Sequence, residues 1–588
     1  MYLLIENFNS GLDSRRMALT SKPGTLQELT NAHITRGGEI EKRKAFELAC
    51  VADAGTFGLH AANGSLWTFG SEPSLYGDIL GFAPGPDPNN IVPNVNYMQL
   101  NAGLPMVKLL SVDNFKGKIY AIAEFEGGSV KHFYNGQQVT SWDSIANSGD
   151  PNSVAAELAL QLNEDGVFSS TSLNNEVYIQ FVNNNQNYSV NIRTVNGGIN
   201  ETQSITVITT AASVNSPQFT KLVVNGAYEQ LDVFTVIIQG KEYTIQAGSS
   251  TIGKFCKTHS DKMYSTSGSL LYFSETSTNG GPSAFTNNTQ NGAGVINLSG
   301  QDSSAQNLTS IAMYQGKLAI FSESSVQVWT MNADPKLNSF SQVLTNIGTS
   351  SPRSVVSLGN IDTYFLSPLG VRSLRARDAS NVAIVSDIGN AIDDIVISDM
   401  RELTQDQRSN AVGLIDPIDG RYWLCVGQKV YVYSYFPASN INAWSIYKPT
   451  APNGIPFQIE HICSLNQRIY VRSGSQIYAY GGINGSTYDD CEVVVTMPYL
   501  DGGKPGHFKT LMAVDSACVG EWEVYSGTDI MAPDVRDYIG KINNSTYSMG
   551  RVSAAGFGSH VGIQMKNNTD GYAKIGNFAV HFEINDAG

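Results

Sequence analysis

Apolar and polar residues alternate with a period of two over many short stretches, and turn residues lie between these stretches. This alternation is typical of strands with one buried face. The clearest unit comprises residues 310–314, 317–321 and 326–329, joined by turns at Gln315-Gly316 and at 322–325. Similar units recur about every fifty residues, a period typical of β-propeller blades, and they turn at Asn63-Gly64, Lys116-Gly117, Ser267-Gly268, Gly359-Asn360, Asp419-Gly420 and Asn466-Gln467. We therefore expect a mainly all-β fold with a propeller-like core of about seven blades. The short first unit, residues 58–70, leaves the number of blades open to within one.

One interval in this repeat is too long. The turns at Lys116-Gly117 and Ser267-Gly268 lie about 150 residues apart, three times the usual step. We expect a small inserted α+β domain at residues 137–252, so that the propeller comprises residues 58–136 and 253–482. Within the insertion, residues 153–163 predict a helix, and residues 177–181 and 234–238 alternate as strands.

Both ends of the chain depart from the repeat. Residues 1–57 contain the best helix candidate, at 26–32, and a charge run at 39–44 that indicates a solvent-exposed face. This N-terminal arm is too short for a core of its own, so we expect it to pack on the propeller or on a neighbouring molecule. Deletion of residues 1–44 should then impair assembly more than folding. After residue 482, alternating strands at 492–496, 522–525 and 577–582 predict a C-terminal β-sandwich over residues 483–588.

The composition, with 56 Gly, 27 Tyr and 24 Phe and only 15% charged residues, fits a turn-rich β protein. A net charge of −15 argues against a nucleic-acid-binding surface, which needs clustered Lys and Arg. The six cysteines form no CxxC pair, so we expect no disulfide framework and a reducing cytoplasm as the folding compartment. We also expect no signal peptide and no membrane span, because no apolar stretch approaches ~18 residues.

Motifs for catalysis are incomplete. Residues 248–254 match the GxxxxGK phosphate loop, but Phe255 replaces the Ser or Thr that would bind Mg²⁺, and the next residues alternate as a strand instead of forming a helix. The eight histidines are scattered, and we interpret His461 as a structural residue at the start of a strand. Asp416 and Asp419 suggest a pair of acids, but they lie in a predicted hairpin turn. We therefore expect no enzymatic activity, no cofactor and no metal.

Separated stretches of the chain carry a family resemblance. The N-terminal part contains FNSGL at 8–12, Arg15-Arg16, PGT at 23–25, LTNA at 29–32 and GGEIEKR at 37–43. FSESSVQVW at 321–329, FLSPLGVR at 365–372 and GRYWL at 420–424 follow in order. Together they resemble the tail nozzle proteins of short-tailed bacteriophages, also called tail tubular protein B or tail hub proteins. The resemblance covers the N-terminal arm and most of the predicted propeller.

This resemblance implies a structural virion protein of the phage tail, assembled in the host cytoplasm. It implies a homohexameric ring below the portal and the adaptor (head–tail connector) ring, with tail fibres or tailspikes as further partners. Duplex DNA would pass through the ring transiently and without specific binding. Because duplex DNA carries about one negative charge per 1.7 Å of its axis, an acidic wall would let it slide. Candidate assembly contacts are Arg15, Arg16, Asn31, Lys42 and Arg43.

Two other classes of function compete. One is a receptor- or glycan-binding virion protein, with or without glycan-degrading activity, which needs clustered acids and aromatic residues on one propeller face. A glycan array or a depolymerase plaque assay would detect it. The other is a β-propeller scaffold outside viruses, which neighbouring genes for a portal and an adaptor would exclude.

Overall fold

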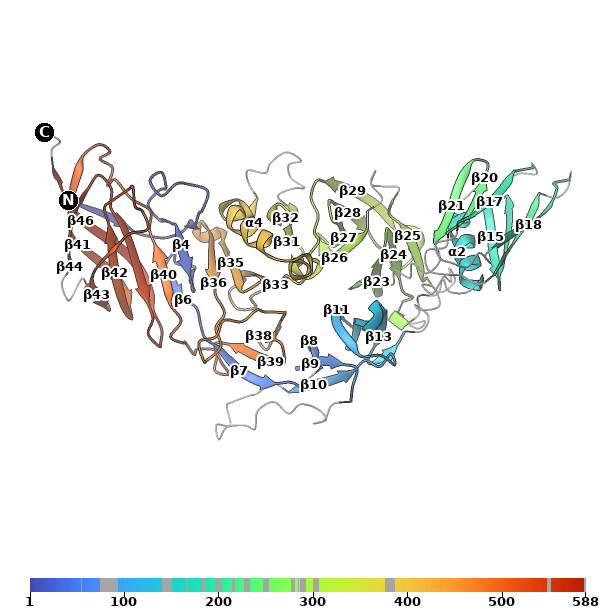
Figure 1. Ribbon diagram of the computed structural model, residues 1–588, viewed down its shortest axis with the longest axis horizontal. Helices are drawn as coiled ribbons and strands as arrows, with labels where there is room; N and C mark the ends of the chain where they lie inside the picture. The colour runs from blue at the N-terminus through green and yellow to red at the C-terminus, as the bar shows by residue number, and fades with distance from the viewer. Residues whose placement is uncertain are drawn as a thin grey trace.

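The computed structural model describes residues 1–53, 55–73, 94–139, 151–164, 168–181, 187–195, 204–213, 217–226, 233–246, 253–276, 281–283, 285, 292–299, 306–375, 387–546 and 551–585. Strands dominate this part of the chain and form many sheets. The molecule is elongated: an all-β unit that holds both chain termini lies at one end, a separate α+β unit lies at the other, and small sheets lie between them (Figure 1).

Seven groups of strands follow one another along the described chain. The first three are β8–β10 (Phe57–Ala62, Ser65–Gly70, Val95–Gln99), β11–β14 (Met106–Phe115, Lys118–Phe125, Val130–Tyr134, Gln137–Gln138) and β22–β25 (Phe255–His259, Lys262–Ser267, Leu270–Phe273, Gly294–Asn297). The next two are β26–β29 (Leu308–Tyr314, Lys317–Ser322, Ser325–Thr330, Ser339–Thr345) and β30–β32 (Val356–Leu358, Asp362–Ser367, Gly370–Ser373). The last two are β33–β36 (Val412–Ile415, Tyr422–Val426, Lys429–Phe436, Ile441–Tyr447) and β37–β39 (His461–Leu465, Arg468–Ser473, Gln476–Tyr480).

Neighbouring groups contact each other through their first strands. β8 contacts β11, β11 contacts β22, and the series continues through β26, β30, β33 and β37. The series also returns to its beginning, because β37 contacts β8. The last sheet is completed by β7 (Phe46–Val51), which pairs antiparallel with β39 although more than 400 residues separate them in sequence. The N-terminal region is thus joined to the last of the seven groups.

The central strands are buried on both faces because each sheet packs between two others. In β27, Ala319 and Phe321 belong to a core shared with Phe365 of the next sheet, whose ring lies 5.0 Å from that of Phe321. Leu318 and Ile320, which point the other way, belong to a core shared with the preceding sheet. Burying one such side chain contributes about 1.5–3 kcal/mol, so both alternating sets stabilise the stack of sheets.

The predicted turns are confirmed as tight hairpins at four places. Asn63-Gly64, Lys116-Gly117, Gln315-Gly316 and Asn466-Gln467 each have positive φ at both central residues, as a type I′ turn requires. Each joins the first and second strands of its sheet. The matching turn in the third sheet is Ser260-Asp261, also with two positive φ angles; it contains no Gly, and the repeat pattern missed it. Ser267-Gly268 joins the second and third strands instead.

The expected insertion has its own core. Its helix α2 (Pro151–Glu164) confirms the prediction at 153–163, and its sheets comprise β15–β16–β19–β18 (Phe168–Leu173, Glu176–Phe181, Phe219–Asn225, Ser204–Thr210) and β17–β20–β21 (Val190–Val195, Val233–Ile238, Lys241–Gln246). Val154, Leu158 and Leu162 recur on one helix face and pack against residues of both sheets. The described elements of this unit run from residue 151 to residue 246. They begin later than the expected residue 137, because β14 at residues 137–138 still belongs to the second small sheet.

The all-β terminal unit consists of two sheets around one core. One sheet contains β1 (Tyr2–Ile5), β5 (Ala32–Ile34), β6 (Ile40–Lys42), β41 (Phe508–Val519), β44 (Val552–Gly558) and β46 (Lys574–Asn585). The other contains β2 (Gly11–Leu12), β3 (Thr25–Leu26), β4 (Glu28–Thr30), β40 (Val493–Thr496), β42 (Glu521–Gly527), β43 (Asp537–Asn543) and β45 (Gly562–Asn567), and it continues into β33–β36. Ile5, Leu29 and Ile40 share this core with Phe578 and other C-terminal residues.

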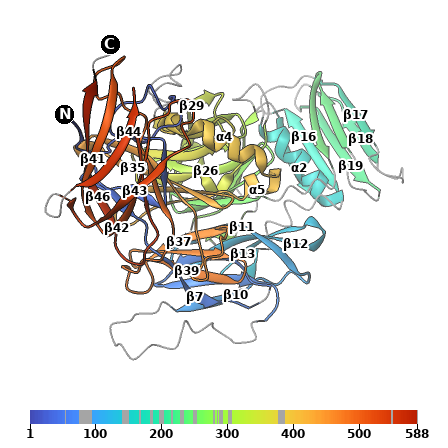
Figure 2. The ribbon, with the colours of Figure 1, turned by 60° about the vertical axis from the view of Figure 1, so that its left-hand side comes forward.

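This topology corrects three expectations for the N-terminal segment. It is not a separate arm, because its strands pair with C-terminal strands inside the terminal unit (Figure 2). Residues 26–32 form strand segments instead of a helix, since β4 is hydrogen-bonded to β40 and five of the seven residues are buried. The charge run at 39–44 is not a solvated face either: Ile40, Lys42 and Arg43 are each fully buried.

Several further elements complete the fold. Two helices lie between the fifth and sixth sheets in the sequence, α4 (Asp393–Glu402) and α5 (Gln405–Ser409). The sequence pattern did not predict them. Thr404 and Gln407 form a capping box at the start of α5. Short 3₁₀ turns occur at η1 (Glu126–Gly128), η2 (Gly281–Ser283), η4 (Pro335–Leu337), η5 (Pro352–Ser354), η7 (Ile388–Ala391) and η8 (Pro437–Ser439). All six cysteines are free and buried. In the described ranges, every helix is too short or too polar to cross a membrane.

Candidate functional site: the cavity between the first strands

The five candidate assembly residues fall into two groups. Arg15 and Arg16 are exposed. Arg15 forms a two-pronged ion pair with Asp13, with Nε 2.9 Å from Oδ1 and Nη2 2.8 Å from Oδ2, which leaves 40% of its side chain exposed. Both residues remain predictions as contacts with another subunit.

Asn31, Lys42 and Arg43 are buried and bind distant parts of the same chain. Lys42 donates from Nζ to Asn567 Oδ1 (3.0 Å) and to the carbonyl oxygen of Thr569 (2.7 Å), and burial lowers its pKa. Asn31 donates from Nδ2 to the carbonyl oxygen of Glu492 at 2.8 Å. These side chains join the N-terminal strands to the C-terminal part, and their burial leaves Lys42 and Arg43 no surface on which to meet a partner. This corrects their assignment as assembly contacts.

The first strands of the seven groups surround shared cavities. One of about 180 Å³ is lined by Leu59, His60, Leu109, Leu110, Ser111, Val112, Phe255, Pro352, Arg353, Val355, Val412, Gly413, His461 and Ile462. A neighbouring cavity of about 640 Å³ shares His60, Val112, Phe255, Val355, Gly413 and Ile462 and extends to residues of β26. The walls are mainly aliphatic, so the few polar side chains among them determine the chemistry.

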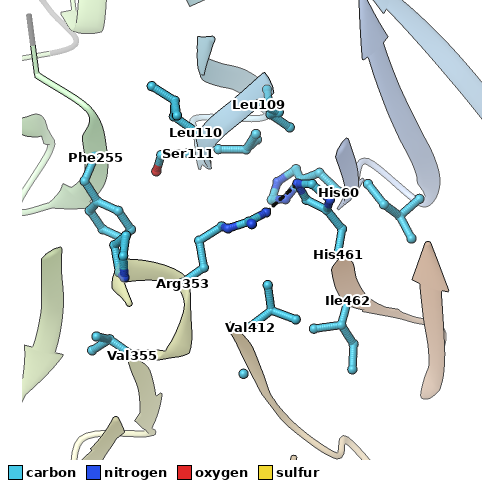
Figure 3. Close-up of a pocket in the computed structure, with 14 residues that line it drawn as sticks. His60, Leu109, Leu110, Ser111, Phe255, Arg353, Val355, Val412, His461 and Ile462 are labelled. Atoms are coloured by element: carbon cyan, nitrogen blue, oxygen red, sulfur yellow. Dashed lines mark hydrogen bonds between the residues drawn. The ribbon is translucent and has the colours of Figure 1, made fainter. Parts of the chain in front are cut away.

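Arg353 is the main polar group of the smaller cavity. Its side chain reaches from η5 towards His461, and a dashed line marks the contact in Figure 3. Nη1 lies 2.7 Å from His461 Nε2 and 3.2 Å from the carbonyl oxygen of Glu460. Nη2 lies 3.1 Å from Asn410 Oδ1. Burial lowers the Arg353 pKa to about 10, which leaves the guanidinium charged at neutral pH.

Both histidines that line this cavity are neutral. A guanidinium group can only donate, so His461 Nε2 accepts the hydrogen bond from Arg353 and its ring carries a single proton. Burial, followed by the charge of Arg353, lowers the His461 pKa well below its ordinary value. His60 Nε2 lies 3.0 Å from Asn114 Oδ1, and burial lowers its pKa as well. His461 begins β37 as predicted, but its ring faces a cavity that the repeat pattern did not reveal.

The larger cavity adds one ion pair. Lys257 Nζ lies 3.3 Å from Asp113 Oδ1, and Asp113 Oδ2 accepts a 2.6 Å hydrogen bond from the amide of Thr258. The charges of this pair cancel. The lining of the two cavities therefore combines one unpaired cation with neutral rings and an internal ion pair, an arrangement that can bind an anion or water.

The other motifs from the sequence are placed as follows. Residues 248–252 of the phosphate-loop match lie outside the described residues, and β22 begins directly at Phe255. Asp416 accepts hydrogen bonds at Oδ1 from the amides of Ile418 and Asp419 within the predicted turn. Over the described ranges, no three His, Cys, Asp or Glu side chains are grouped to hold a metal ion.

Sequence reasoning missed Arg353 and His60 as members of one site. The repeat pattern contains a usable signal for this site. The first strand of every repeat borders the cavities, so polar residues in or beside those strands are candidates for the lining. The signal is weak, since η5, which carries Arg353, lies between two repeats.

Comparisons with known proteins assign no family. No protein-family model and no curated protein matches the chain. Among solved structures, BBS1N in complex with ARL6DN is similar over 63% of this chain and 89% of that chain, with 9% identity and a TM-score of 0.16. Apo AztD from Citrobacter koseri is similar over 78% and 97%, with 9% identity and a TM-score of 0.17. TM-scores this low carry no argument about this chain.

Proposed function

We propose that this chain is a tail nozzle protein of a short-tailed bacteriophage, a structural subunit of a homohexameric ring around the DNA ejection channel. Its core would be a seven-bladed β-propeller, its terminal unit a β-sandwich, and its α+β unit the inserted domain. The circuit of contacts from β8 through β37 and back to β8 supports the propeller. The pairing of β7 with β39 supports it further, because a last blade built from both chain regions holds the disc closed.

The observation that carries the proposal is the placement of two separately cored units at opposite ends of the central sheets (Figure 1). A closed ring of identical subunits needs a rigid subunit with two different, complementary faces. The terminal unit is joined to the central sheets by continuous strand pairing, since β2 and β4 both pair with β36. A subunit built in this way can present one end to a neighbour without bending at the joint.

Charge supports a channel through which DNA slides. Six subunits of −15 carry 6 × (−15) = −90, and a net negative wall does not hold the phosphates of passing DNA. The adaptor ring above and tail fibres or tailspikes at the side would be the other partners. The protein would be located in the virion tail after assembly in the host cytoplasm.

Electron microscopy of the purified full chain, with and without its adaptor, tests this proposal. We expect two-dimensional class averages with six-fold symmetry and a central hole. Arg16→Glu should weaken ring formation while leaving the unfolding midpoint of the subunit unchanged, because Arg16 is exposed. Lys336→Glu, at an exposed position on η4, serves as the charge-matched control. Solitary particles without a hole, even when the adaptor is present, would refute the proposal.

A further inference from the structure

We propose that the cavity beside Arg353 binds a small oxyanion of the inorganic phosphate type, held by the guanidinium group. The proposal does not depend on ring formation or on a viral origin. It rests on three features of the described residues: the neutral partners of Arg353, the balance of charge around it, and the space next to it.

Every hydrogen-bond partner of Arg353 is neutral. The guanidinium group donates to the carbonyl oxygens of Glu460 and Asn410, to Asn410 Oδ1 and to His461 Nε2. Within the described ranges, no carboxylate lies within 4.0 Å of it, whereas Arg372, Arg421 and Arg472 each have a carboxylate partner. Arg353 is half-buried, so its charge has limited contact with water, and it differs from these three arginines in having no carboxylate partner.

The surroundings supply the missing charge only in part. Glu460 and Asp406 attract Arg353, but Glu460 is engaged with Arg472 at 2.8 Å, and Asp406 is engaged with Lys108 at 3.1 Å. The cations Arg353, Arg472 and Lys108 and the two acids together leave a net charge of 3 − 2 = +1 beside the cavity. The neutral rings of His60 and His461 add nothing to this sum, and the pair of Lys257 and Asp113 cancels internally.

The site also offers a free donor and room. Nε of Arg353 has no bonded acceptor within the described part of the chain, whereas both terminal nitrogens are occupied. The adjoining cavity of about 180 Å³ compares with roughly 30 Å³ for one water molecule in the liquid. A five-atom tetrahedral anion with a hydrating water therefore fits.

The chemistry of the walls favours an oxyanion. Guanidinium groups bind phosphate and carboxylate oxygens through charge-assisted hydrogen bonds, which are stronger than neutral ones. Leu109, Leu110 and Val412 line the same cavity (Figure 3), and their low polarity strengthens attraction between the ion and the cation. We expect phosphate or sulfate to bind more tightly than chloride, because a doubly charged anion is attracted more strongly by the guanidinium charge at the same distance.

Titration of the full chain with sodium phosphate tests the site. Sodium chloride keeps the ionic strength constant, and calorimetry and the thermal unfolding midpoint are measured in parallel. We expect phosphate to bind with one ion per chain and to raise the midpoint, and chloride at equal ionic strength to do neither. Absence of a phosphate-specific effect in the unmodified protein would overturn the proposal, and this arm requires no variant.

Variants then locate the bound ion. Arg353→Gln should weaken phosphate binding at least tenfold, and Arg353→Lys, which keeps the charge but loses the planar fork, should weaken it less. The matched control is Arg36→Gln, because the Arg36 side chain is 64% exposed and lies outside the cavity. Equal phosphate binding in Arg353→Gln and in the unmodified protein would place the ion elsewhere and refute the site.

Discussion

Replacing Arg43 tests how the N-terminal strands are held to the rest of the molecule. This fully buried side chain donates from Nε to Asn31 Oδ1 (3.1 Å), from Nη1 to Asp489 Oδ2 (3.0 Å) and from Nη2 to Thr450 Oγ1 (2.8 Å). Its guanidinium carbon also lies 5.2 Å from the centre of the Phe46 ring. One side chain thus connects the end of β6 with segments more than 400 residues away.

The cost of Arg43→Met follows from what it leaves behind. Removing one partner of a buried ion pair destabilises a protein by about 3–5 kcal/mol. Asp489 keeps some hydration, since 19% of its side chain is exposed, and Asn31 Oδ1 still accepts a 2.8 Å hydrogen bond from the amide of Lys448. We therefore expect the lower part of that range, about 3 kcal/mol.

Urea unfolding, followed by tryptophan fluorescence, measures this loss. A double-mutant cycle with Asp489→Asn should give a coupling free energy of about 1–3 kcal/mol, because the two residues are in direct contact. Arg36→Met is the control and should change stability by less than about 0.5 kcal/mol, as surface substitutions usually do. If Arg43→Met is as mild as Arg36→Met, the buried network does not hold the terminal unit together.

Three further changes test other parts of the structure. Deletion of residues 1–44 should unfold the terminal unit and expose it to proteolysis, because β1, β4 and β6 pair with its C-terminal strands; a trimmed chain with full protease resistance would contradict the topology. Gln467→Gly should raise the unfolding free energy by about 0.5–1 kcal/mol, since Gln467 has a φ of 61°, whereas Gly316→Ala in the matching turn should lower it. Burial lowers the pKa of His132 to about 3, so the unfolded chain takes up the proton first as pH falls. The stabilisation from neutral His132 is thus complete above about pH 6.5 and decreases towards pH 3 by about 1.4 kcal/mol per pH unit. In His132→Gln, the plot of urea midpoint against pH should lose the part of its slope that comes from this one proton. An unchanged slope would contradict the burial of His132.

Local patterns predicted much of the fold. Alternation identified strands such as β27 and β46, and the apolar spacing in residues 153–163 identified α2. Asn-Gly and Gln-Gly pairs marked type I′ turns because their backbone angles suit few other residues. The turn at Ser260-Asp261 was missed for the same reason: without Gly, the positive φ angles there depend on the flanking strands.

The sequence by itself determined many strands, four of the hairpin turns, the helix at 153–163 and the paucity of charge, because each depends on neighbouring residues. Only the tertiary structure decided the partners of the N-terminal strands, the burial of Lys42 and Arg43, and the position of Arg353 in a cavity. The physical reason is that alternation specifies which face of a strand is buried but not which strand lies beside it. A charged side chain can be buried only where hydrogen-bonding groups from distant segments converge on it, and no local pattern records that convergence.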